Sequence, residues 1–301
     1  MIWLRNTMVA VALLGVVACD SEPEIEFQVE TRTVRPAGFY ANAHLIMGQK
    51  DAILIDALML KADAVNVVKT IKFEEKNLTT IFITHPHADH YLGLDVLKAA
   101  FPEAKIVATQ GTVDEIRKTA AAEIEYWKPT LGYSLTDTFV VPDVLEGDTL
   151  ILEGAELKVI ELPAAESVHP TVVYFPAMKA VFTGDLAFSE IHMWLAENRP
   201  DAWLENIAAI KALGPIELVY PGHGNRNDPG VLDDTASYIR DFQASAELAS
   251  TSIDIIADMK SKYPELMLID VLNFSAYGVM GEKMPTPAEN IGELVHGFKQ
   301  N

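Results

Sequence analysis

The feature that most constrains this chain is the run at residues 85–90, His-Pro-His-Ala-Asp-His. It follows residues 79–84, Thr-Thr-Ile-Phe-Ile-Thr, a β-branched and aromatic stretch that is typical of a buried strand. Neutral imidazoles and carboxylates are ligands that Zn²⁺ accepts at about 2.0–2.2 Å. A turn lets neighbouring side chains converge, and Pro86 would fix φ within it. A polar loop is the alternative, but this density of ligand types in a chain with 8 histidines predicts a metal site.

Length and composition narrow the class of protein. A chain of 301 residues can form one large domain or two small ones with a substantial core. An apolar content of 50% argues against disorder. The net charge of −20 and the pI near 4.7 argue against a surface that binds nucleic acid. They do not exclude a metal-binding pocket inside the fold.

The N-terminus has the pattern of an exported protein. Residues 8–18 form an apolar run after Arg5, with the length of a signal-peptide core and too short to span a bilayer. The run ends in Val-Val-Ala-Cys and resembles the lipobox of bacterial lipoproteins, in which cleavage precedes the cysteine and its thiol is lipidated. Cys19 is the chain's single cysteine, so no disulfide forms within the chain and no thiolate binds a metal in the folded body.

Asp20 resembles the residue that retains such lipoproteins in the inner membrane of some bacteria. We therefore expect a periplasmic protein anchored to the inner membrane through Cys19. An ordinary signal peptide, with secretion, is the alternative.

The remaining chain predicts one sandwich domain followed by helices. Residues 1–18 are the expected signal peptide and residues 19–26 a tether. Over residues 27–230, strands and helices occur in two similar halves, each a block of strands followed by helices. This order favours two mixed β-sheets packed face to face with helices on both outer faces, an αββα sandwich. Residues 231–301 predict a helical C-terminal extension packed on the domain.

Two aromatic stretches are candidates for a substrate pocket. Residues 126–133 contain two tyrosines, a tryptophan, a proline and a glycine, which predicts an exposed loop. Residues 191–195, Ile-His-Met-Trp-Leu, form the second stretch. Both could line an apolar pocket, and packing in the core is the alternative.

Four more candidate ligands lie near the ends of short elements. Asp185 follows an apolar strand in Thr-Gly-Asp, and His223 follows another in Pro-Gly-His-Gly. His169 precedes the strand expected at residues 171–175, and His192 lies in the loop after Asp185. Each of them alone is typical of a turn or a cap. Together with residues 85–90, Asp185 and His223 become expected ligands.

With these residues the chain resembles the metallo-β-lactamase-fold hydrolases, in their glyoxalase II-like or lactonase-like branch. The signature His-x-His-x-Asp-His is complete at residues 85–90. The later Gly-Asp and Gly-His elements match residues 184–185 and 222–223, and the early Leu-Ile-Asp matches residues 54–56. The resemblance covers roughly residues 30–225 and implies that Asp56 supports the metal loop from behind.

The resemblance implies a metal-dependent hydrolase with two Zn²⁺ ions, Fe or Mn being possible instead. The ligands it implies are His85 and His87 for the first metal, Asp89, His90 and His223 for the second, and Asp185 for both. A water between the metals would have a pKa near ~7 and would attack a polarised carbonyl. Asp89 and Asp185 are the expected catalytic residues. The expected substrate is a small ester, thioester, lactone or amide.

The third ligand of the first metal remains open. In the family a histidine opens the short segment before the next strand, and counting back from residues 171–175 puts Ser167 at that position. A hydroxyl is a poor Zn²⁺ ligand beside imidazole. We therefore expect His169 to complete the first site. The alternative is a first site with only two histidines, and His192, which is more typical of a loop residue, is the remaining candidate.

Two alternative functions also remain open. The absence of a cysteine from the mature body excludes the β-lactamase branch that uses a cysteine ligand, and Asp185 points away from the other dizinc branch. A β-lactam hydrolase of the same fold is nevertheless one alternative. A zinc-binding lipoprotein without turnover is the other.

Overall fold

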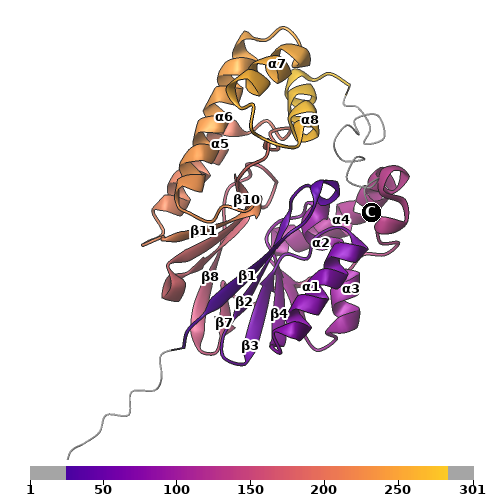
Figure 1. Ribbon diagram of the computed structural model, residues 1–301, viewed down its shortest axis with the longest axis vertical. Helices are drawn as coiled ribbons and strands as arrows, with labels where there is room; N and C mark the ends of the chain where they lie inside the picture. Colours follow the sequence, from indigo (N-terminus) through magenta and orange to yellow (C-terminus); the bar gives the residue numbers. More distant parts are fainter. Residues whose placement is uncertain (1–24, 284–301) are drawn as a thin grey trace, which may run out of the picture.

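The computed structural model describes residues 25–283. The expected signal peptide, Cys19 and most of the tether lie outside the described residues, as do residues 284–301 of the expected helical extension. The described residues form two stacked β-sheets with helices on both outer sides (Figure 1). The predicted αββα sandwich is therefore confirmed.

The two sheets are both mixed. In the first, with strand order β1-β2-β3-β4-β5-β6, strands β1 to β3 are antiparallel and β3 to β6 are parallel. In the second, with order β11-β10-β9-β8-β7, only the pair β10 and β11 is parallel. The strands of the first sheet are β1 (Gln28–Thr33), β2 (Asn42–Met47), β3 (Asp51–Ile55), β4 (Asn77–Ile83), β5 (Lys105–Ala108) and β6 (Asp143–Val144). Those of the second are β7 (Thr149–Leu152), β8 (Ala155–Glu161), β9 (Thr171–Phe175), β10 (Ala180–Phe188) and β11 (Leu218–His223).

The helices divide between the two sheets in chain order (Figure 1). On the side of the first sheet lie α1 (Lys61–Phe73), α2 (Ala88–Tyr91), α3 (Leu94–Ala100) and α4 (Gln110–Leu131). On the side of the second lie α5 (Pro200–Lys211), α6 (Gly230–Leu248), α7 (Ser252–Lys262) and α8 (Ile269–Met280). Among the described residues, no helix is both long and apolar enough to cross a membrane.

Alternation of side chains along the strands separates the core between the two sheets from the core under the helices. On β3, Ile53 and Ile55 point into the cluster between the sheets, whereas Ala52 and Leu54 belong to the cluster under the helices. Phe82 of β4 and Phe182 of β10 meet in the same inner cluster. Because side chains alternate across a strand, a strand buried on both faces reads as a continuous apolar run.

One local prediction was wrong. Residues 126–131 do not form a loop, because α4 continues to Leu131 with Pro129 inside its last turn. A proline disrupts a helix through its missing N–H and its clash with the preceding turn, and both costs are smallest near a helix end. The aromatic side chains Tyr126 and Trp127 therefore stand on a rigid helix.

The segment that contains α8 is joined to the loop that follows β10. Met267 donates a backbone hydrogen bond to Glu190 O at 3.0 Å and accepts one from His192 N at 2.9 Å. On α8, Ser275 Oγ donates to Met193 O at 2.9 Å. These bonds place α8 against residues 190–195 and thereby close one side of the cavity described below.

Candidate metal centre

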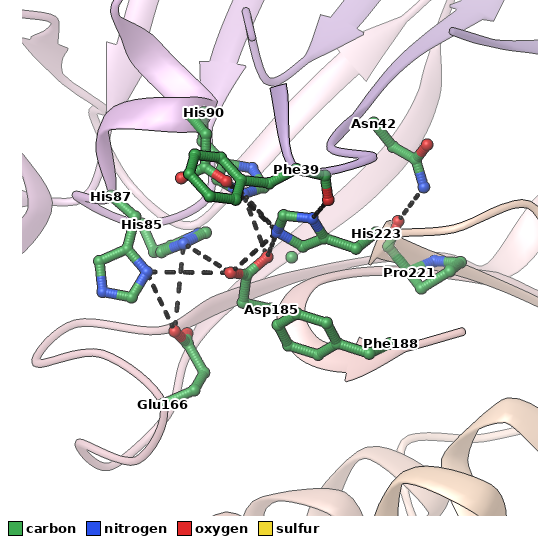
Figure 2. A network of polar contacts seen from close by, with 12 residues as sticks. Phe39, Asn42, His85, His87, His90, Glu166, Asp185, Phe188, Pro221 and His223 are labelled. Carbon is green, nitrogen blue, oxygen red and sulfur yellow. Dashed lines mark hydrogen bonds and ion pairs between the residues drawn. The ribbon is translucent and has the colours of Figure 1, made fainter. Parts of the chain in front are cut away.

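Strand ends and short loops bring seven polar side chains together in one cluster, part of which Figure 2 shows. His85 and His87 follow β4, and α2 begins directly after them. Asp185 and His223 come from the neighbouring parallel strands β10 and β11. The members of this metal cluster are His85, His87, Asp89, His90, Glu166, Asp185 and His223.

Four atoms form the first half of the metal cluster. His85 Nε2 lies 3.5 Å from Asp185 Oδ2 and 4.0 Å from Glu166 Oε2. His87 Nδ1 lies 3.7 Å from Glu166 Oε2 and 3.8 Å from Asp185 Oδ2. In a tetrahedral site with bonds of 2.0–2.1 Å, ligand atoms lie roughly 3.4 Å apart. The four atoms therefore have nearly the spacing that a single ion requires.

The second half of the metal cluster shares Asp185 with the first. Asp185 Oδ1 lies 3.1 Å from His90 Nε2 and 3.2 Å from His223 Nε2. Asp89 Oδ2 lies 3.5 Å from His223 Nε2 and 3.8 Å from His90 Nε2. Each half thus combines two imidazoles with one carboxylate of its own, and Asp185 directs one oxygen to each half.

Buried hydrogen bonds orient the imidazoles. Asp56, directly after β3, accepts from His90 Nδ1 at 2.9 Å and from Thr84 Oγ1 at 2.9 Å. His223 Nδ1 donates to Phe39 O at 2.7 Å. A ring that donates from Nδ1 has a free lone pair on Nε2, the atom that faces the metal cluster. Asp56 lies behind residues 85–90, the position that the resemblance implies.

Two glycines let the chain approach the metal cluster closely. Gly184 has φ +50°, and a Cβ there would lie 2.8 Å from Thr84 Oγ1. A Cβ at Gly222 would lie 2.2 Å from Asp185 Oδ1. Any larger residue at either position would displace a ligand or its support.

Polar atoms inside the metal cluster lack partners. His85 Nε2, Glu166 Oε2 and Asp185 Oδ1 are buried, and none of them has a hydrogen-bond partner among the described residues. An unsatisfied buried polar atom costs about 1–3 kcal/mol, and more if charged. Imidazole nitrogens with carboxylate oxygens suit Zn, Fe or Mn. The residues present therefore fit a metal centre.

The charges of the metal cluster also favour a cation. Burial alone would lower the pKa of His87, but a hydrogen bond to Asp185 and the charges of Glu166 and Asp185 raise it to about 9. Burial would raise the pKa of Asp185, yet the imidazoles of His223, His90 and His85 hold it well below its usual range. Without a metal the carboxylates draw protons onto the imidazoles, and bound cations would take the place of those protons.

His169 is not in the metal cluster, so its predicted placement is corrected. Its ring is partly exposed, its Nδ1 donates to Glu161 Oε1 at 2.9 Å, and it packs against Gly111 of α4. His192, the remaining histidine candidate, also lies outside the metal cluster. It is buried beside α6 with its Nδ1 2.9 Å from the Tyr238 hydroxyl, and burial lowers its pKa to about 4.

Glu166, which the sequence analysis missed, occupies the open position instead. It lies in the loop between β8 and β9, which the hydrogen bond from Leu162 N to Pro170 O closes at 2.9 Å. Ser167 Oγ donates to Glu166 Oε1 at 2.9 Å, leaving Oε2 directed at His85 and His87 (Figure 2). The only available signal was a carboxylate one residue before the expected histidine.

A cavity of about 550 Å³ opens onto the metal cluster. Its walls come from α4, α8, the loop after β10 and the segment around Phe39. Tyr126 and Trp127 line it together with Ile191 and Trp194, so both predicted aromatic stretches contribute. The side chains of His87 and Asp89 are 24% and 16% exposed, and these two members of the metal cluster face the cavity.

Known enzymes resemble the chain over part of its length. It is 27% identical over 157 residues to a hydroxyacylglutathione hydrolase of Cereibacter sphaeroides, covering 52% of each chain. It is 29% identical over 158 residues to hydroxyacylglutathione hydrolase 1 of Vibrio vulnificus, covering 52% of this chain and 53% of that one. The chain spans about half the length of the curated relatives it matches.

Solved structures share the fold. The DIM-1 metallo-β-lactamase exposed to ceftazidime aligns with a TM-score of 0.54 at 19% identity, covering 72% of this chain and 97% of that one. A metallo-β-lactamase from Pontibacter korlensis aligns with a TM-score of 0.54 at 21% identity, covering 72% and 99%. At these identities the likeness carries the fold alone.

The family model of the metallo-beta-lactamase superfamily matches residues 36–223. This range contains all seven residues of the metal cluster and the supporting Asp56. The chain belongs to the metallo-beta-lactamase superfamily.

Proposed function

We propose that this protein is a metal-dependent hydrolase with two zinc ions that cleaves an ester, thioester, lactone or amide. The observation that carries the proposal is the metal cluster itself, two groups of ligand atoms that share Asp185 below an open cavity. The relatives named hydroxyacylglutathione hydrolase support a hydrolase of acyl compounds. We assign His85, His87 and Glu166 to one metal and Asp89, His90 and His223 to the other.

The metals would supply a water of lowered pKa and polarisation of the scissile carbonyl. The protein's own residues would then hold and move protons around that centre. Asp89 lines the cavity with its Oδ2 3.5 Å from His223 Nε2, and from this position its carboxylate would accept a proton released beside the metal cluster. Asp56 keeps His90 in the tautomer that presents Nε2, and Ser167 keeps Glu166 directed inward.

Metal analysis combined with turnover tests the proposal. Protein purified without chelator is expected to contain close to two metal ions per chain and to hydrolyse simple aryl esters. Removal of the metals should abolish turnover, and zinc should restore it. His90→Ala should lose turnover, whereas Lys98→Ala, at an exposed position on α3, is the control and should keep it. Metal content near zero after zinc addition would overturn the proposal, as would full activity of the chelated protein.

We also propose that the protein is a lipoprotein anchored to the inner membrane on its periplasmic side. The support is the apolar run that ends at Cys19, followed by Asp20. Expression of Cys19→Ala in a bacterial host should move the protein from the membrane fraction to the soluble fraction. Identical fractionation of mutant and wild type would contradict the anchor.

A further inference from the structure

The wall of the cavity is apolar and aromatic above the metal cluster. Six rings line it, contributed by Phe39, Tyr126, Trp127, Phe188, Trp194 and Phe274. Phe39 and Trp127 meet edge to face with ring centroids 5.2 Å apart, and Trp194 and Phe274 lie 5.9 Å apart. Such rings gain most when they cover an apolar or aromatic ligand.

The same wall offers no cation. Among the described residues, no lysine or arginine lines the cavity. Apart from the metal cluster and the Tyr126 phenol, the ionisable group on the wall is Glu123 of α4. Burial raises the pKa of Glu123. As a carboxylate, Glu123 provides no partner for an anion and repels it.

The composition of the cavity wall determines which acyl compounds can bind. A glutathione thioester carries two carboxylates and one ammonium group at neutral pH. Bringing a carboxylate into an apolar wall without a cationic partner is strongly unfavourable. Glu123 and the net charge of −20 add repulsion to that cost.

We propose that the cavity selects an uncharged ester, thioester or lactone with an aromatic or alkyl body, and that Glu123 excludes anionic substrates. This inference rests on the proposed hydrolase function and specifies its substrate class. Trp127 and Phe274 both line the wall, one on α4 and one on α8. Helix α8 thereby contributes to specificity.

A matched pair of probes tests the inference in the zinc-loaded enzyme. The probes are 4-nitrophenyl hexanoate and the 4-nitrophenyl monoester of adipic acid, which differ mainly in the charged end of the acyl chain. We expect kcat/KM to favour the hexanoate by about a hundredfold, as for a hydrophobic pocket that meets an added polar group. Glu123→Lys should reduce this preference at least about tenfold by pairing with the terminal carboxylate.

Glu125→Lys is the matched control, because Glu125 is exposed on the same helix and does not line the cavity. It makes the same change in net charge and should leave the preference unchanged. A wild-type enzyme that prefers the adipate ester would overturn the inference. An equal effect of the two lysine variants would also overturn it, because the discrimination would then come from overall charge.

A binding measurement separates this inference from the hydrolase proposal. Hexanoyl anilide and adipic acid monoanilide can be titrated against tryptophan fluorescence, which reports on Trp127 and Trp194. Tighter binding of the neutral anilide by a protein that hydrolyses neither ester would support the pocket inference and overturn the proposed function. Equal or tighter binding of the charged anilide would overturn the pocket inference in an enzyme that turns over.

Discussion

The two halves of the metal cluster contain the same kinds of ligand atoms, but different structural elements and hydrogen bonds hold them. In the second half, His90 and His223 are fully or almost fully buried, and Asp56 and the Phe39 carbonyl fix their rings. In the first half, His87 borders the cavity with 24% of its side chain exposed, and Glu166 stands on a loop. Buried hydrogen bonds to ligands strengthen metal binding. The comparison therefore predicts a tightly held second metal and a more exchangeable first one.

The largest effect is expected at the one residue that both halves share. Asp185→Asn removes a charge between His85, His90 and His223 while keeping the size of the side chain. Both metals should be lost, and kcat/KM should fall at least about 1000-fold, because both metal roles disappear. Elemental analysis and ester turnover check this. Retention of two metals by the variant would contradict the shared role of Asp185, because Asp185 would then not link the two halves.

A smaller effect, larger in the second half than in the first, is expected at Asp56. Asp56→Asn weakens the acceptor that His90 Nδ1 uses directly, and it reaches the first half only through Thr84, whose hydroxyl lies 2.9 Å from His85 Nδ1. Loss of a direct partner typically reduces metal affinity by about 10–100-fold. Competition with a metal-binding dye should show one site weakened more than the other. Equal weakening of both sites would contradict the assignment of Asp56 to the second half.

The origin of each ligand explains what the sequence could predict. Asp89, His90, Asp185 and His223 lie in contiguous motifs beside strand ends or glycines, so local spacing places them. Glu166 comes from the loop before β9, where the path of the chain depends on the bond between Leu162 and Pro170 and not on a motif. Counting from the strand therefore gave Ser167, and the nearby His169 was a misleading candidate.

Helix α4 shows that a local sequence signal can also mispredict an element of the fold. Pro129 predicts a break, yet α4 continues to Leu131, whose side chain is buried in the core. The layered sandwich was predictable because the apolar runs of the strands and the periodic helices determine it.

Stepwise chelation compares the two halves directly. We expect one metal to leave at a chelator concentration about tenfold lower than the other, because His87 of the first half is more exposed than Asp89 of the second, 24% against 16%, and Glu166 rests on a loop. The Asp56→Asn variant should narrow this gap. Simultaneous release of both metals from the wild type would show that the halves do not differ.

The smallest effect concerns the metal-free protein. Its His87 has a pKa of about 9, above the usual 6.5, and the pKa values of His90 and His223 are raised as well. A raised histidine pKa stabilises the fold fully below the unfolded value, and this contribution is lost as the pH rises through the folded value. The Tm of chelated protein should therefore fall by a few degrees between pH 6.5 and pH 9, whereas metal-loaded protein should change less. An increase in Tm over that range would contradict the charge assignment.

Counting metals in single variants tests most directly whether Glu166 completes the first metal site. Glu166→Ala should retain one metal per chain, and Glu166→His should retain two, because imidazole can replace the carboxylate. His169→Ala should also retain two, because its ring bonds to Glu161 and not to the metal cluster. A Glu166→Ala protein with two metals, or a His169→Ala protein with one, would contradict the account.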